Sequence, residues 1–75
     1  MGGIRNRVRD LRAASEMTQQ QLADKIDLTR QTVIAIEGDK YSPSLETAFR
    51  IANVFGVPLE QVFQYQNDRK VSSKR

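Results

Sequence analysis

The sequence contains no cysteine and no histidine. It can form no disulfide, and this composition fits a reducing cytoplasm. Few routes remain to a structural zinc site, because zinc in proteins is held mainly by cysteine and histidine. The remaining polar residues show no spacing that would assemble a nucleophile, a base and an oxyanion site. We therefore expect no metal, no cofactor, no small-molecule ligand and no enzymatic activity.

Long apolar runs are also missing. No stretch approaches the roughly 20 apolar residues of a membrane span, and no apolar signal region opens the chain. We therefore expect a cytoplasmic protein without a membrane partner. A chain of 75 residues forms one small domain at most, and buries about 60% of the surface that its unfolded form exposes. Such a core is marginal, which makes self-association a reasonable expectation.

Net charge is low over most of the chain. Residues 1–63 contain eight Lys or Arg and eight Asp or Glu, so the formal charge of +3 comes from residues 64–75. The charges are nevertheless segregated, because four arginines crowd the first expected helix: Arg5, Arg7, Arg9 and Arg12. The affinity of the body for an anionic partner must therefore depend on where its charges lie.

Residues 19–38 have the spacing of two short helices joined by a tight turn. Ala23 is small enough for the point where two helices cross, and Asp27 tolerates the positive φ that the turn requires. Val33 and Ile36 lie three residues apart and so share a face, which can pack the second helix onto the first. This is the spacing of a helix-turn-helix motif, and it predicts contact with DNA.

Hydrophobic periodicity predicts five helices in all. They are expected over about residues 4–15, 19–26, 30–37, 45–55 and 58–63. The three middle helices each follow a residue type that caps helix N-termini: Thr18, Thr29 and Ser44. Thr18 and Gln21 together have the pattern of a capping box. The apolar stripe of the fourth helix is expected to begin at Leu45 and to end before Gly56.

After the fifth helix, Phe63-Gln64-Tyr65-Gln66 alternates apolar and polar residues, as a short strand does. The expected fold is therefore all-α: a compact five-helix domain containing a helix-turn-helix, with a candidate short C-terminal β element. Its expected parts are a flexible N-terminus at residues 1–3, the DNA-binding domain at 4–63, and a strand or dimerisation segment with a mobile basic tail at 64–75.

The second helix of the motif turns one face away from Val33 and Ile36. The residues of that face are the candidates for base reading: Arg30, Gln31, Thr32, Ile34 and Ala35. Arg30 can bond guanine and Gln31 adenine, each through two hydrogen bonds, while Ile34 can pack against a thymine methyl. The alternative is an ordinary solvated surface with one scattered apolar residue. The motif around these residues favours contact in the major groove.

Candidate phosphate contacts surround that face. Three of them lie at expected helix starts, where free N–H groups and the helix dipole favour an anion. The full set is Gln19, Gln20, Thr29, Lys40 and Arg9. Arg12 and Glu37 are interpreted differently, as a structural ion pair joining the first helix to the third. Breaking such a buried pair on one side costs about 3–5 kcal/mol.

The segments RQTVIAIE, YSPSLETAF and FGVPLEQVF together resemble the Xre-type (Cro/phage-repressor-like) helix-turn-helix regulators. The resemblance covers nearly all of residues 4–63 and is strongest to short stand-alone members similar to the cytolysin-operon repressor of enterococci. It implies the same Arg12–Glu37 pair. It also implies base contacts at Arg30, Gln31, Thr32 and Ala35, and phosphate contacts at Gln19, Thr29 and Lys40. Two residues depart from the family pattern: Asp27, where glycine is usual, and Asp39, where a basic or polar residue is usual.

The resemblance also implies a homodimer that binds an inverted repeat of double-stranded DNA. Members of the family commonly dimerise through the fifth helix and the residues after it, and the short strand is expected to pair with the segment around Gly3. The candidate interface residues are Pro58, Gln61, Val62, Phe63 and Tyr65. The alternative is that Phe63 and Tyr65 only cover the open end of the bundle.

Two functions remain to be compared. The first is a sequence-specific transcriptional regulator, more exactly a repressor, associated with the nucleoid when bound. The second is a protein-binding adaptor, for example an antitoxin built on the same fold. A neutralising segment usually carries apolar anchors, whereas residues 67–75 contain only Val71. The tail therefore favours the regulator.

Overall fold

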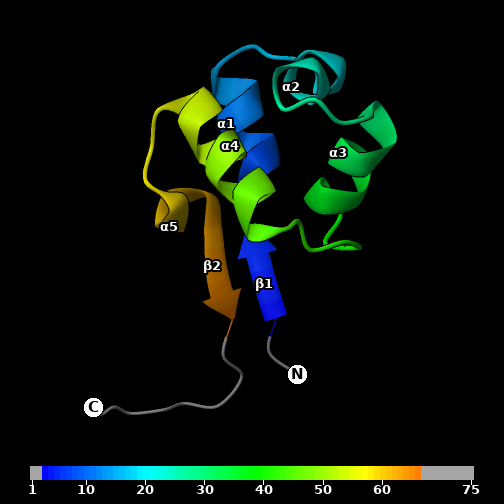
Figure 1. Ribbon diagram of the computed structural model, residues 1–75. Helices are drawn as coiled ribbons and strands as arrows, with labels where there is room; N and C mark the ends of the chain where they lie inside the picture. Colours follow the sequence, from blue (N-terminus) through cyan, green and yellow to red (C-terminus); the bar gives the residue numbers. More distant parts are fainter. Residues whose placement is uncertain (1–2, 67–75) are drawn as a thin grey trace, which may run out of the picture.

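Five helices and one two-stranded sheet make up residues 3–66, the part of the chain that the computed structural model describes (Figure 1). In chain order they are β1 (Gly3–Asn6), α1 (Val8–Ala14), α2 (Gln19–Lys25), α3 (Arg30–Glu37), α4 (Leu45–Phe55), α5 (Leu59–Val62) and β2 (Phe63–Gln66). The expected five-helix fold with a short β element is confirmed. The mobile basic tail that the sequence predicts at residues 67–75 lies outside the described residues.

The N-termini of α2, α3 and α4 are capped by the hydroxyl side chains that the sequence predicts. Thr18, Thr29 and Ser44 each accept a hydrogen bond from the backbone N–H three residues further on. At α2 the capping box is complete, because the side chain of Gln21 also accepts from the backbone N–H of Thr18 at 2.8 Å. These bonds satisfy N–H groups that have no partner within the helix.

Left-handed backbone conformations occur where the chain turns sharply. Asp27, between α2 and α3, has a φ of 61°, and Gly56, at the end of α4, has a φ of 67°. Gly38 ends α3 as expected but has a φ of −88°, and the left-handed residue is its neighbour Asp39, with a φ of 60°. The carboxylate side chains at 27 and 39 thus stand in conformations that glycine adopts more easily.

The first helix starts later than expected. Residues 4–6 belong to β1 rather than to a helix. Gly3 pairs with Gln66 in the same sheet, as the family resemblance implies for the segment around Gly3. Helix α1 begins at Val8, whose backbone N–H donates to the side-chain oxygen of Asn6 at 3.0 Å. Helical periodicity did not reveal this boundary, because Ile4 and Val8 fit a helix but Ile4 pairs with Tyr65 instead.

The core lies where all five helices meet. Its largest fully buried side chains come from every helix: Val8, Leu22, Ile26, Val33, Ile36, Ile51 and Val62. The expectation that Val62 lies in a dimer interface is therefore wrong, because its side chain is fully buried within the monomer. Leu45, expected to begin the buried stripe of α4, is instead 68% exposed. Phe63, expected in the fifth helix, begins β2.

In Figure 1 the sheet extends beyond one end of the helical body, opposite α2. Its antiparallel register places Ile4 beside Tyr65 and Asn6 beside Phe63. The backbone N–H of Arg7 donates to the carbonyl oxygen of Val62 at 2.8 Å, so the sheet is joined to the body where α1 begins and α5 ends. Between residues 3 and 66, no helix is long and apolar enough to cross a membrane.

Candidate nucleic-acid interface

Helix α3 is held on the body by its inner face. Val33 and Ile36 are each 1% exposed and lie in the common core. Ala23, fully buried on α2, contributes the small side chain expected at the crossing of the two helices. The backbone N–H of Leu28 donates to the carbonyl oxygen of Ala23 at 2.9 Å and closes the turn that contains Asp27. Residues 19–38 therefore have the geometry of a helix-turn-helix motif.

The outer face of α3 is open to solvent. Arg30 and Gln31 are exposed, and Ile34 is 44% exposed although it is apolar. Thr32 and Ala35 are half-buried at the edge of this face. Their surroundings include two shallow depressions, one of which is bordered by Gln31, Ile34, Ala35, Gly38 and Lys40. All five predicted base-reading residues thus lie on or beside one accessible surface, which we call the reading face.

Behind this surface, Arg12 of α1 forms a two-bond ion pair with Glu37 of α3. Arg12 Nε donates to Glu37 Oε2 at 2.7 Å and Arg12 Nη2 donates to Oε1 at 3.1 Å. Only 17% of the Arg12 side chain and 2% of the Glu37 side chain are exposed. Hydrogen bonding to Glu37 raises the pKa of Arg12 above its ordinary value, although partial burial opposes the effect. The predicted ion pair is therefore present. Arg12 keeps its positive charge throughout the neutral pH range.

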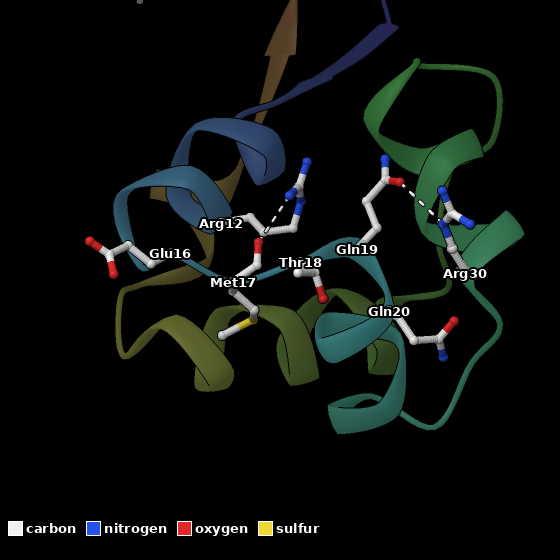
Figure 2. A pocket seen from close by; sticks show the side chains of 7 residues that line it. All are labelled: Arg12, Glu16, Met17, Thr18, Gln19, Gln20 and Arg30. Atoms are coloured by element: carbon white, nitrogen blue, oxygen red, sulfur yellow. Dashed lines mark hydrogen bonds between the residues drawn. The ribbon is translucent and has the colours of Figure 1, made fainter.

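Gln19 connects this ion pair to the reading face. Its side-chain Nε2 donates to Glu37 Oε1 at 3.2 Å, while its Oε1 accepts from Arg30 Nε at 3.5 Å. Figure 2 shows the Gln19 and Arg30 side chains directed toward each other across the gap between α2 and α3. The amide of Gln19 thus links Glu37 to Arg30, and its Nε2 has a second N–H with which it can donate to a phosphate.

The other predicted phosphate contacts have different surroundings. Gln20 donates to Asp24 at 2.9 Å, and Thr29 Oγ1 lies 3.0 Å from Thr32 Oγ1. Lys40 is exposed beside the reading face. Arg9 is 71% exposed and lies 3.9 Å from Glu37, at the outer edge of the ion pair. These side chains surround α3 but do not form one preassembled anion site.

Tyr41 is a surface residue that the sequence interpretation missed. It is half exposed and borders a depression together with Thr29, Gln31, Thr32 and Ala35. A phenolic hydroxyl is one of the groups that bond DNA phosphates. Its position in the loop directly after the reading helix is a signal that would have revealed it.

The geometry of α2, the turn and α3 agrees with comparison to known proteins. A helix-turn-helix family model matches residues 8–62, which is most of the chain. The chain belongs to the Xre-type helix-turn-helix family. This membership places it among helix-turn-helix regulators and not among enzymes.

Several curated relatives of this helix-turn-helix protein cover most of its length. The uncharacterized HTH-type transcriptional regulator MJ0272 of Methanocaldococcus jannaschii is 48% identical over 65 residues, which are 87% of this chain and 98% of the relative. The cryptic phage CTXphi transcriptional repressor RstR of Vibrio cholerae is 32% identical over 72 residues, which are 92% of this chain and 65% of the relative.

Solved structures support the fold. A protein from Bacteroides fragilis superposes with a TM-score of 0.76 at 22% identity, over 83% of this chain and all of that chain. The hypothetical transcription factor NHTF from Neisseria superposes with a TM-score of 0.68 at 28% identity, over 72% of this chain and 61% of that chain. The helix-turn-helix protein therefore shares its architecture with both.

Proposed function

We propose that this protein is a sequence-specific transcriptional repressor that binds an inverted repeat of double-stranded DNA as a homodimer. The observation that carries the proposal is the open outer face of α3, whose inner face is fixed in the core by Val33 and Ile36. A helix held in this way can enter the major groove without changing its position on the body. Two relatives are described as repressors: RstR and the immunity repressor protein of Bacillus phage phi105. They support repression rather than activation of transcription.

Base reading is assigned to the residues of that face. Arg30 presents two parallel donors to O6 and N7 of guanine, and Gln31 presents a donor and an acceptor to adenine. Thr32 bonds at the edge of the groove, and Ile34 with Ala35 packs against thymine methyl groups. This role accounts for the exposure of Ile34, which is costly in water but favourable against a methyl-lined groove.

Phosphate contacts fix the position of α3 in the groove but do not distinguish sequences. We assign them to Arg9 of α1, Gln20 of α2, Thr29 before α3 and Lys40 after it. Gln19 acts mainly through Arg30, to which it is bonded, and Tyr41 is added as a phenolic donor beside Thr29. On this proposal the protein works in the cytoplasm and is held at the nucleoid while bound.

The homodimer is proposed to form through an apolar surface at the end of the body that carries the sheet. Ile4, Leu45, Leu59 and Phe63 border an apolar groove, and Tyr65 pairs with Ile4 on the neighbouring strand. Leu45 and Tyr65 are 68% and 69% exposed. We call Ile4, Leu45, Phe63 and Tyr65 the association face. Pro58 and Gln61, both exposed, remain at its predicted edge.

Selection of bound duplexes from a random DNA pool tests the proposal. The expected result is a single inverted repeat whose half-site centres lie about 34 Å apart, so that two copies of α3 enter successive major grooves. Failure to enrich any sequence, together with no binding to duplex DNA at micromolar concentration in low salt, would remove the repressor and favour the adaptor.

A further inference from the structure

Asn6 joins the strand that carries part of the association face to the end of the helix that carries the reading face. Its side-chain Nδ2 donates to the carbonyl oxygen of Ile36 at 2.8 Å and to Asp39 Oδ1 at 2.9 Å. Its side-chain oxygen accepts from the backbone N–H of Val8 at 3.0 Å. Two acceptors face the amide nitrogen and one backbone donor faces the amide oxygen, so the orientation of the Asn6 side-chain amide is determined.

One bond from Asn6 reaches a carbonyl group at the end of α3. The carbonyl oxygen of Ile36 belongs to the last turn, where carbonyls have no partner within the helix, and it also accepts from the backbone N–H of Asp39 at 3.1 Å. Asp39 follows with a φ of 60°, a conformation that costs energy for a residue with a side chain. This conformation holds the Asp39 carboxylate beside Asn6, and Arg5 of the same strand lies 3.9 Å from its other oxygen.

The link has a short path to the association face. Ile4 lies two residues before Asn6 on β1, and both side chains belong to the same face of the strand. Ile36, which receives the bond, lies about one turn after Thr32 on α3. The orientation of α3 relative to the association face is therefore fixed by side-chain bonds, and not only by apolar packing around Val33.

We propose that Asn6 is a positioning residue, which sets the spacing at which two copies read DNA. The inference rests on the proposed homodimeric repressor and adds the device that fixes its half-site separation. One extra base pair between half-sites moves them apart by about 3.4 Å and rotates them by about 35°. A rigid link between the two faces makes such a change costly, whereas a weakened link lets α3 adjust.

The test compares the wild-type protein with Asn6→Asp on the selected repeat and on repeats with one base pair added or removed. Aspartate keeps the acceptor for the backbone N–H of Val8, but it loses both donors and repels Asp39. The double variant Asn6→Asp with Asp39→Asn restores a bond between positions 6 and 39 in the reverse direction. It also carries the same net charge as the wild type, which makes it the matched control.

We expect the wild type to lose about tenfold or more in affinity for each change of spacing. In Asn6→Asp this penalty should shrink by about threefold to tenfold, and the double variant should recover part of it. An equal penalty in all three proteins would overturn the inference while leaving the repressor intact. A wild type that selects no inverted repeat would instead overturn the proposed function, and the inference with it.

A fold check accompanies the comparison, because Asn6 makes three hydrogen bonds and Asn6→Asp removes two of them. Circular dichroism will show whether the variant is helical. If it is not, Asp39→Gly replaces it, since glycine adopts the φ of 60° without strain and removes only the carboxylate. Its matched control is Asp39→Asn, which has the same charge and still accepts from Asn6. A spacing penalty equal in these two variants would also overturn the inference.

Discussion

Replacing Arg12 by methionine should destabilise the domain strongly. The substitution keeps a long apolar stem but removes both hydrogen bonds to Glu37 and the bond from Arg12 Nη1 to the carbonyl oxygen of Met17 at 2.9 Å. The Glu37 side chain, only 2% exposed, is then a buried carboxylate without its main partner. Leaving a buried charge uncompensated in this way costs about 3–5 kcal/mol.

Two contacts reduce this cost. Gln19 still donates to Glu37, and Arg9 lies 3.9 Å from it. We therefore expect the low end of the range, about 3 kcal/mol. A domain of this size has a total unfolding free energy of about 4–11 kcal/mol. The melting temperature should fall by about 12–24 °C, because each kcal/mol moves it by about 4–8 °C in a small domain.

The assay is thermal and urea unfolding followed by circular dichroism. The matched control is Arg9→Met, which removes an arginine that is 71% exposed and should cost less than about 1 kcal/mol. The double variant Arg12→Met with Glu37→Met should recover much of the loss, since two apolar groups replace a buried pair. A loss below about 1 kcal/mol in Arg12→Met, or a double variant as unstable as the single one, would refute the reasoning.

Three further predictions concern a turn, the dimer and the tail. Gly56→Ala should lower the unfolding free energy by about 1 kcal/mol in urea titrations, because φ is 67° there. Gly38→Ala is the control and should lower it clearly less, because φ is −88° at that position. Equal losses in the two variants would contradict the backbone argument. Leu45→Ser should abolish the dimer in sedimentation while leaving unfolding of the monomer nearly unchanged, and a persistent dimer would remove the association face. Deleting residues 67–75, which contain four Lys or Arg and one Asp, should flatten the salt dependence of DNA binding without altering sequence preference; an altered preference would contradict this role.

Local chemistry made much of the fold predictable. Thr18 and Ser44 cap helices through bonds that span three residues, so a short stretch of sequence is sufficient to predict them. Asp27 marks the turn for the same reason, since its tolerance of positive φ is a property of the residue itself. The outward face of α3 followed from the spacing of Val33 and Ile36, which the core retains.

Errors arose where a distant partner decides the outcome. Ile4 fits a helical stripe as well as a strand, and its pairing with Tyr65, sixty-one positions later in the chain, settles the choice. Val62 and Leu45 were assigned to the wrong environments, because burial at the end of a helix depends on what packs against it. Asn6 was missed because a single polar residue gives no signal until its two acceptors, Ile36 on α3 and Asp39 after it, are in place.

Equilibrium binding of Arg30→Ala tests the central claim most directly. Affinity should be measured on the selected duplex, on duplexes with each base pair of one half-site changed, and on a scrambled duplex. The expected result is a loss of about 1–3 kcal/mol on the selected duplex, relaxed preference at one base pair per half-site, and little change on scrambled DNA. Lys40→Ala is the control and should weaken binding to all duplexes alike. An equal loss on selected and scrambled DNA for Arg30→Ala would contradict base reading by the outer face of α3.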